Sequence, residues 1–205
     1  SDILFGIKND VDFIAASFVR TAFDVKLIRN LLDANGGSAI NIIAKIENAE
    51  GVANIDEIIR ESDAIMIARG DLGVEIPAME VPSVQKYLIN KCRLLGKRVI
   101  TATEMLESMI HNPRPTRAEL SAVANAVYDG TSAVMLSGET AAGKYPVESV
   151  RNMVQTIEFT EKSIHYDRRF KVADFAIKNN VDAVSHGTCA MAVDVGAKCI
   201  VVNSL

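Results

Sequence analysis

The amino-acid sequence predicts an α/β protein built from repeated strand–helix units. Short apolar runs alternate with segments of helical period, the units repeat at spacings of about 24 to 34 residues, and each apolar run ends in polar or charged residues. The runs are apolar on both faces, which is typical of parallel strands covered on both sides. This alternation with short loops indicates βαβ units with right-handed crossovers.

The predicted elements follow one another along the first 165 residues. The strand candidates are rich in Ile, Val, Met and Ala and lie at residues 12–19, 41–47, 64–70, 98–103 and 132–138. The helix candidates lie at residues 22–34, 52–61, 83–95, 117–128 and 147–165. Gly96 follows the third helix and Pro146 begins the last, where these residues favour helix ends and starts. Thr116 and Glu119 have the spacing of a capping box at the start of the fourth helix.

The number of units favours part of a TIM barrel. A complete (β/α)8 barrel has about 250 residues, or roughly 31 per unit. Residues 1–162 therefore hold about five βα units of a barrel-type catalytic domain. An open doubly wound sheet is the alternative, and its site gathers at one switch point. Because polar residues follow all five predicted strands, we expect the barrel, in which every strand feeds one catalytic face.

The pattern changes after His165. Residues 163–205 contain a charged stretch, a helix candidate at 182–196 and a strand candidate at 199–203. We interpret residues 163–205 as the beginning of a second, C-terminal α/β domain.

Composition and charge argue against several classes of protein. The 205 residues carry a net charge of -4 with a pI near 5.4, whereas nucleic-acid-binding surfaces are basic. No apolar run approaches the roughly 18–20 residues that span a bilayer, and the first residues lack the order of a signal peptide. We therefore expect neither nucleic acid nor membrane as a partner. Cys92, Cys189 and Cys199 are scattered without CxxC spacing, which predicts reduced thiols and a cytoplasmic location.

Lys45 and Glu47 are the first candidate functional residues. They lie two apart in a predicted strand, so their side chains leave on the same face. Burying them in an apolar strand is unfavourable without compensation, so they form either a structural ion pair or a functional site. In the functional interpretation Glu47 binds a metal and Lys45 meets an anionic substrate. Asp71 follows the next strand, and two carboxylates with open positions suit Mg²⁺ or Mn²⁺.

Two further strand ends carry candidate binding residues. Gly70 and Gly73 at a strand–helix junction either let backbone N–H groups approach an anion or form an ordinary tight turn. Thr103 either offers a hydroxyl on the same face or bonds to nearby backbone. Glu104 is placed to pair with either Arg69 or Arg117, and the sequence does not rank these two partners.

Five segments, in order along the chain, resemble the pyruvate kinase family. They are residues 43–48 (IAKIEN) with Gly51, 66–73 (MIARGDLG), 102–109 (ATEMLESM), 113–119 (PRPTRAE) and 135–140 (MLSGET). Five motifs in register make the resemblance highly specific. It implies that residues 1–162 correspond to strands 4–8 of the family barrel. The implied reaction is phosphoryl transfer from phosphoenolpyruvate to ADP with a divalent metal, Mg²⁺ or Mn²⁺, giving pyruvate and ATP as the final step of glycolysis.

The resemblance also assigns roles, position by position. Lys45 matches the lysine that stabilises the transferring phosphoryl group, and Glu47 and Asp71 match the metal-binding carboxylates. Gly70 and Asp71 fall where backbone amides meet the substrate carboxylate. Thr103 matches the threonine that contacts the substrate.

Ser137 and Glu139 lie beside the implied site. The resemblance implies that they take part in the protonation that converts the enolate to pyruvate. The family also uses K⁺, but the ligands expected for K⁺ lie outside this chain, as do a phosphoryl-binding arginine and a lid domain. The resemblance further implies that the whole protein is a homotetramer. We therefore expect the chain to be an incomplete segment of a pyruvate kinase that is inactive alone.

Two other functions remain open. A metal-dependent aldolase of the barrel type shares the features around Glu47 and Asp71 and also handles a pyruvate enolate on a divalent metal. Residues 113–119 and 137–140 argue against an aldolase. A non-catalytic structural fragment is the remaining alternative.

Overall fold

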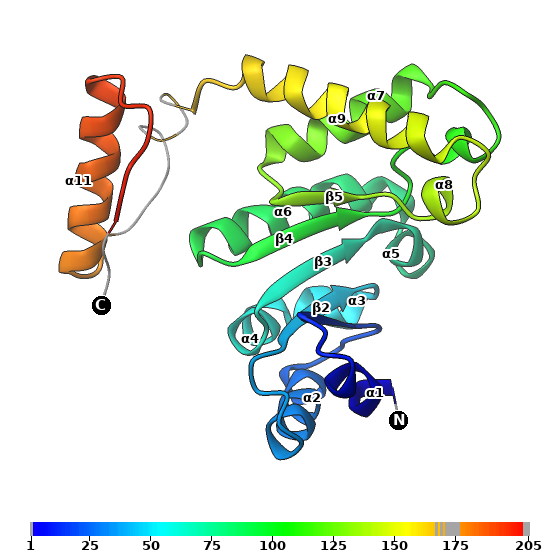
Figure 1. Ribbon diagram of the computed structural model, residues 1–205, viewed down its shortest axis with the longest axis horizontal. Helices are drawn as coiled ribbons and strands as arrows, with labels where there is room; N and C mark the ends of the chain where they lie inside the picture. The colour runs from blue at the N-terminus through cyan, green and yellow to red at the C-terminus, as the bar shows by residue number, and fades with distance from the viewer. Residues whose placement is uncertain (1, 167, 169, 171–176, 203–205) are drawn as a thin grey trace. The chain divides into compact units, whose positions relative to one another are not determined.

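The structure is a computed structural model that describes residues 2–166, 168, 170 and 177–202. The chain divides into two compact units, Ser1–Ser163 and Ile164–Leu205 (Figure 1). Among the described residues, none of the helices combines the length and the apolar content that a bilayer span requires.

The first unit is built on a parallel sheet, which has five strands in the described part of the chain. They are β1 (Phe13–Ala16), β2 (Asn41–Ile46), β3 (Ala64–Ala68), β4 (Arg98–Ala102) and β5 (Ala133–Met135). The strand order is β1-β2-β3-β4-β5, and all neighbours are parallel. A doubly wound sheet reverses its order at a switch point, whereas strands in chain order are typical of a (β/α)8 barrel. The predicted α/β class is therefore confirmed, and the strand order is that of a barrel.

The helices of this unit are α1 (Asp2–Lys8), α2 (Ala22–Ala34), α3 (Ala49–Ala53), α4 (Ile55–Glu61), α5 (Arg69–Glu75), α6 (Val81–Leu94), α7 (Arg117–Asp129), α8 (Gly138–Ala141) and α9 (Pro146–Ser163), with short 3₁₀ turns η1 (Ala78–Glu80) and η2 (Glu107–Ile110). Three predictions were wrong in part. Gly138, predicted as the end of the strand at residues 132–138, begins α8. The helix predicted at residues 52–61 is divided at Asn54, which caps both α3 and α4. Arg69 and Gly70, predicted as a strand end, begin α5 instead because β3 loses its hydrogen-bonded partner after Ala68.

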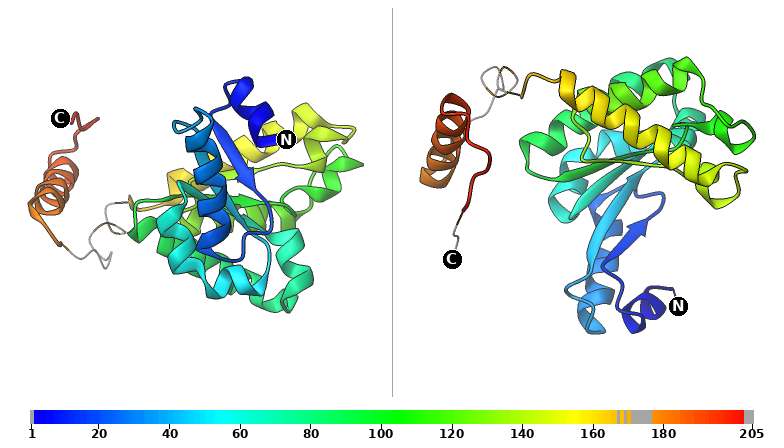
Figure 2. Two further views of the ribbon diagram at one scale, coloured as in Figure 1. Left: turned by 90° about the horizontal axis from the view of Figure 1, so that it is seen from below. Right: turned by 45° about the horizontal axis from the view of Figure 1, so that its top comes forward.

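The two faces of the sheet have different surroundings. Ile42, Ala44 and Ile46 of β2 pack in one core with residues of α2, α4 and α6, which lie along the same side of the sheet (Figure 2). The opposite face carries a second cluster whose buried members Ile43, Ala64, Met66 and Ala102 all come from strands. Because side chains alternate along a strand, Lys45 lies on the same face as Ile43.

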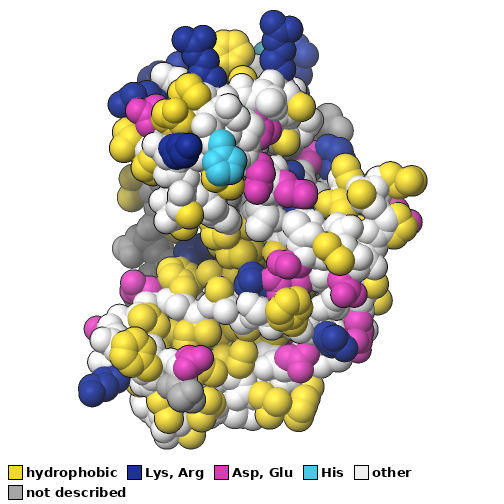
Figure 3. Space-filling model, turned by 90° about the vertical axis from the view of Figure 1, so that its right-hand side faces the viewer, with side chains coloured by type: hydrophobic (Ala, Val, Ile, Leu, Met, Phe, Trp, Pro, Cys, Tyr) yellow, Lys and Arg dark blue, Asp and Glu magenta, His cyan; other side chains and the backbone are white. Residues whose placement is uncertain are grey.

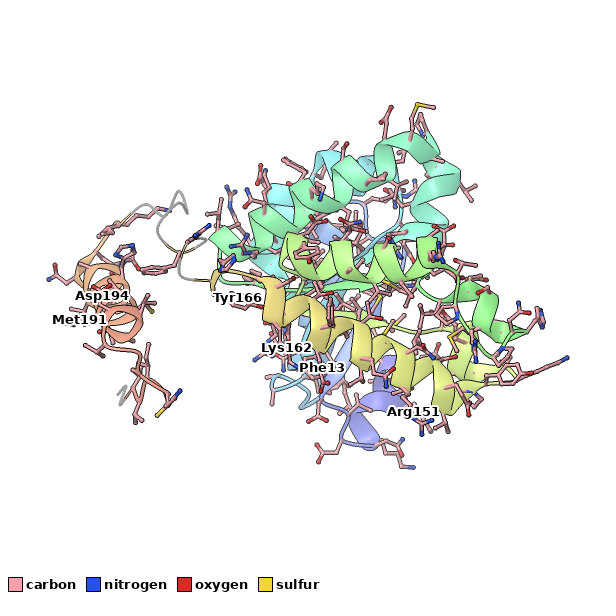
Figure 4. The ribbon with its side chains drawn as sticks, turned by 90° about the horizontal axis from the view of Figure 1, so that it is seen from above. Phe13, Arg151, Lys162, Tyr166, Met191 and Asp194 are labelled. Carbon is pink, nitrogen blue, oxygen red and sulfur yellow. The ribbon has the colours of Figure 1, made fainter. Side chains whose placement is uncertain are left out.

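A third core joins the end of the sheet to α7 and α9. Met105, Leu106 and Met109 pack there with Val123 of α7 and Met153 of α9. Arg151 and Lys162 mark the course of α9 in Figure 4. This packing fixes the segment between β4 and α7, which borders the site described below.

In the second unit the predicted helix at residues 182–196 is present as α11 (Asn180–Asp194), whose N-cap is Asn179. The Phe170 ring stacks on His186, with ring centroids 4.6 Å apart. The strand predicted at residues 199–203 is wrong for residues 199–202, which form no strand because no described segment pairs with them. Asn203 lies outside the described residues.

Candidate functional site

The candidate residues lie at or directly after the carboxyl ends of β2 to β5. Neighbouring parallel strands bring these ends to one edge of the sheet. The arrows of β3 and β4 in Figure 1 point toward the side that faces the viewer in Figure 3. On that side, acidic and basic side chains surround a hollow in which hydrophobic side chains are visible (Figure 3).

Lys45 and Glu47 form an ion pair at the end of β2. The Lys45 Nζ lies 2.6 Å from the Glu47 Oε1, and it also donates a hydrogen bond to the Ser17 Oγ at 3.0 Å. The Lys45 side chain is 22% exposed and the Glu47 side chain 1% exposed. The ammonium group is therefore held by two partners and still reaches solvent. Sequence reasoning did not find this role of Ser17, although its place after β1 was a usable signal.

The Glu47 carboxylate is buried with one oxygen incompletely satisfied. Its Oε2 accepts a hydrogen bond from the backbone N–H of Phe18. Its Oε1 contacts the Lys45 ammonium but receives no hydrogen bond in the described structure. Buried carboxylate oxygens normally have donors, and a hard divalent cation binds such anionic oxygens. The chemistry of Glu47 therefore fits a Mg²⁺ or Mn²⁺ ligand.

Asp71 provides a second carboxylate at the neighbouring strand end. It lies in the first turn of α5, and its side chain is exposed and makes no hydrogen bond or ion pair with the described residues. In the described part of the chain, no three His, Cys, Asp or Glu side chains converge as a metal-binding group. Glu47 and Asp71 are the two carboxylates of the described residues that would supply oxygen ligands at these neighbouring strand ends.

Gly70 and Thr103 are brought into direct contact. The Gly70 N–H donates to the Thr103 Oγ1 at 2.7 Å, and this hydroxyl donates to the Ala102 carbonyl at 2.7 Å. Thr103 and Glu104 have left-handed backbone conformations, with φ of 63° and 51°. Two consecutive non-glycine residues in this region are unusual. The N–H group of Gly70, which was predicted to approach an anion, therefore donates its hydrogen bond to the Thr103 hydroxyl in this structure.

Arg69 is a functional candidate that sequence reasoning missed. It is 8% exposed, and its guanidinium donates to the Thr103 carbonyl at 3.2 and 2.7 Å and to the Glu104 carbonyl at 2.8 Å. Burial lowers the pKa of Arg69, and the Glu104 carboxylate opposes this effect. The guanidinium thus binds the backbone of Glu104 and makes no ion pair with its carboxylate among the described residues. A cation directly after a buried apolar strand was the available signal.

Ser137 and Glu139 form a separate pair at the end of β5. Glu139 is 1% exposed; its Oε2 accepts from the Ser137 N–H at 2.8 Å and its Oε1 from the Leu106 N–H at 3.0 Å. The carboxylate thereby ties the end of β5 to the segment after β4. Within the described residues, neither side chain makes a hydrogen bond to Lys45 or Thr103.

Comparison with known proteins identifies relatives of this chain. The family model for the pyruvate kinase barrel domain matches residues 1–150. A pyruvate kinase of Geobacillus stearothermophilus is 59% identical over 202 residues, which are 96% of this chain and 34% of that protein. A pyruvate kinase of Sporosarcina psychrophila is 67% identical over 165 residues, 80% of this chain and 28% of that protein.

A solved structure is similar as well. The crystal structure of a pyruvate kinase from Cryptosporidium parvum matches with a TM-score of 0.92 and 47% identity, covering 96% of this chain and 42% of that one. The chain thus spans 34% of the length of the Geobacillus relative and 43% of that of a Clostridium acetobutylicum relative. The matched barrel domain and these identities place this chain in the pyruvate kinase family.

Proposed function

We propose that this chain carries the metal- and phosphoryl-binding part of an active site that transfers a phosphoryl group from phosphoenolpyruvate to ADP. The observation that supports this most is the ion pair of Lys45 with buried Glu47 at the carboxyl end of β2. An ammonium group that reaches solvent stands there beside a buried carboxylate oxygen whose described partner is that ammonium alone. This combination suits binding of a metal and an anion together.

Lys45 stabilises the phosphoryl group during transfer. Negative charge spreads over the three equatorial phosphoryl oxygens in such reactions, and a preorganised cation lowers the barrier. Ser17 and Glu47 hold the Lys45 ammonium in advance, so its ordering is complete before the substrate arrives. Its partial exposure leaves one side open to the substrate.

Glu47 and Asp71 hold Mg²⁺ or Mn²⁺. An ion held by these carboxylates would supply positive charge to the phosphoryl oxygens of the substrate. The Phe18 N–H keeps the Glu47 carboxylate oriented through its second oxygen. K⁺ is a further proposed cofactor, and the family resemblance implies that its ligands lie outside this chain.

The substrate carboxylate accepts hydrogen bonds from the backbone N–H groups of Gly70 and Asp71. The Gly70 N–H then exchanges the Thr103 hydroxyl for a carboxylate oxygen, and the freed hydroxyl contacts the substrate. Ser137 serves the proton that converts the enolate to pyruvate, and Glu139 holds Ser137 in place through its N–H. The whole protein would be a cytoplasmic homotetramer, as the family resemblance implies.

The full-length protein that contains this chain provides the test. With phosphoenolpyruvate, ADP and Mg²⁺, we expect equal amounts of ATP and pyruvate, and a large loss of both in Glu47→Gln. Glu50→Gln is the matched control, since Glu50 is exposed and pairs with Arg20 at 3.7 Å. Cleavage of a 2-keto-4-hydroxy acid without phosphoryl transfer would instead identify an aldolase and refute the proposal.

A further inference from the structure

The backbone at Thr103 and Glu104 requires an external support. Both residues have positive φ, which side chains other than glycine adopt rarely. Such conformations persist where neighbouring groups hold them, and they gather at functional sites. The turn determines where the Thr103 hydroxyl lies, and this hydroxyl accepts a hydrogen bond from the Gly70 N–H.

Arg69 supplies that support. Its guanidinium donates to the carbonyl oxygens of both Thr103 and Glu104, so one planar group fixes two successive peptide units. The fork geometry of arginine makes these several bonds at once, which a lysine ammonium does not reproduce. Arg69 and Thr103 are 34 positions apart, and the contact joins the end of β3 to the end of β4.

A second layer holds the guanidinium from its other side. The Arg69 Nη1 donates to the Oε1 of buried Gln85 at 3.3 Å, and the Gln85 Nε2 donates to the Asp129 Oδ2 at 2.9 Å. Asp129 thereby fixes which end of the Gln85 amide faces Arg69. Lys86 pairs with the other oxygen of Asp129. Helices α6 and α7 are thus linked through these side chains to the turn after β4.

We propose that Arg69 is a positioning residue that holds the Thr103–Glu104 turn in its left-handed conformation and so places the Thr103 hydroxyl at the substrate site. Gln85 and Asp129 complete the support. The effect on substrate binding rests on the proposed function, whereas the effect on the Gly70–Thr103 hydrogen bond does not. The two effects are therefore measured separately.

Hydrogen exchange of the Gly70 amide tests the positioning role directly in the full-length protein. Arg69→Met should release the turn and raise this exchange rate about tenfold, the scale of one lost hydrogen bond. Gln85→Met should raise the Gly70 exchange rate by a smaller factor. If Arg69→Met does not fold, the exchange rate in Gln85→Met alone tests the positioning role. Unchanged exchange at Gly70 in the folded variants would overturn the proposal.

Arg29→Met is the matched control. Arg29 also donates to two backbone carbonyls, those of Ser38 and Ile40, and it pairs with Asp63 at 2.8 Å. These partners lie before β2 and β3, at the opposite end of the strands. Its loss should lower the melting temperature while leaving Gly70 exchange unchanged. Faster Gly70 exchange in this control as well would reduce Arg69 to a general structural role and overturn the proposal.

Kinetics test the consequence for the substrate. We expect Arg69→Met to raise the KM for phosphoenolpyruvate about tenfold and to leave the KM for ADP nearly unchanged. In a protein that already carries Thr103→Val, Arg69→Met should cause no further increase in the KM for phosphoenolpyruvate. Additive effects of the two substitutions would overturn the claim that Arg69 acts through Thr103. If Thr103→Val leaves the KM for phosphoenolpyruvate unchanged, the proposed role of Thr103 fails while faster Gly70 exchange in Arg69→Met still supports the positioning role.

Discussion

Lys45 and Glu47 lie on the same face at the end of β2 but differ in exposure to solvent. The loop after β1 covers Glu47 and donates the Phe18 N–H to it, whereas Lys45 reaches solvent beside Ser17. Burial of a carboxylate is unfavourable unless donors or cations compensate, and the two groups that contact Glu47 provide this in part. The arrangement leaves an ammonium group available to an anionic ligand.

Replacing Lys45 by Met in the full-length protein should lower kcat far more than it weakens substrate affinity. One preorganised hydrogen-bond donor that stabilises the charge developing in the transition state contributes a factor of about 10²–10³ in rate. Steady-state kinetics with phosphoenolpyruvate and ADP provide the measurement. Lys26→Met is the control, because Lys26 pairs with Glu61 and does not contact Lys45 or Glu47. Near-normal turnover of Lys45→Met would exclude the proposed role of this residue.

Some site residues could be predicted from the sequence and others could not. The spacing of Lys45 and Glu47 determines that they share a face, so their proximity follows from strand geometry. The role of Arg69 depends on backbone carbonyls 34 and 35 positions away, and no local pattern indicates such a contact. The left-handed turn at Thr103 is equally hidden, because neither Thr nor Glu favours positive φ.

At the scale of elements, Glu119 joins helix α7 to the segment before it. Its carboxylate accepts hydrogen bonds from Thr116, which completes the predicted capping box, and from the backbone and hydroxyl of Ser108. Burial alone raises the pKa of Glu119, but the hydrogen bonds from Ser108 and Thr116 outweigh it and lower the pKa below its usual value of 4.5. The ionised carboxylate is therefore the form that stabilises the fold.

Because the folded-state pKa is lowered, this stabilisation is complete above the usual pKa and is lost as the pH falls through the lower folded value. Glu119→Gln should reduce the free energy of unfolding by about 1 kcal/mol at pH 7, the scale of a lost helix cap. The difference from wild type should shrink as the pH falls below the usual value of 4.5. Urea unfolding at several pH values measures this, with exposed Glu107→Gln as the control. A difference independent of pH would contradict the assigned role.

Gly51 is required by a close approach between elements. A Cβ at this position of α3 would lie 2.7 Å from the Val19 carbonyl oxygen. Gly51→Ala should therefore lower stability by about 1–3 kcal/mol, as overpacking does. Gly187→Ala in α11 is the contrasting variant, because no atom lies within 4 Å of the added Cβ and alanine favours helix. Thermal melts compare the two, and equal melting temperatures for Gly51→Ala and wild type would refute the packing argument.

The strands were predictable because buried parallel strands are apolar on both faces and end at polar residues. The bounds of the strands agree with the predicted ranges within a few residues. The strands are also parallel, as predicted. Helix α5 was not predictable, since Arg69 and Gly70 directly follow the apolar run of β3 and glycine disfavours helix. The break at Asn54 between α3 and α4 likewise depends on a contact elsewhere, the hydrogen bond from its side chain to the Arg20 carbonyl.

At the scale of the first unit, β1 and β5 are the outer strands of the described sheet. The sequence of β1, Phe13–Ala16, contains no charged residue or proline that would protect an edge. Phe23, Leu27 and Leu31 of α2 are also exposed, and Val147, Val150 and Val154 of α9 line an apolar depression. Unprotected edges and apolar patches of this kind favour association.

The 205-residue chain expressed by itself should therefore self-associate. Light scattering after size-exclusion chromatography should give a mass well above the 22.2 kDa of one chain. A monodisperse monomer with a cooperative thermal transition would show that the sheet is stable with β1 and β5 at its edges. The expectation from edge protection would then be wrong.

The proposed metal site depends on how the whole sheet brings strand ends together, since its two carboxylates follow β2 and β3. Mn²⁺ binding to the full-length protein, followed by the paramagnetic relaxation of water protons, tests this most directly. Glu47→Gln and Asp71→Asn should each weaken Mn²⁺ binding more than about tenfold, because a hard cation loses an anionic ligand. Glu50→Gln should leave binding unchanged. Unchanged Mn²⁺ affinity in both Glu47→Gln and Asp71→Asn would show that the two carboxylates are structural and would contradict the proposed active site.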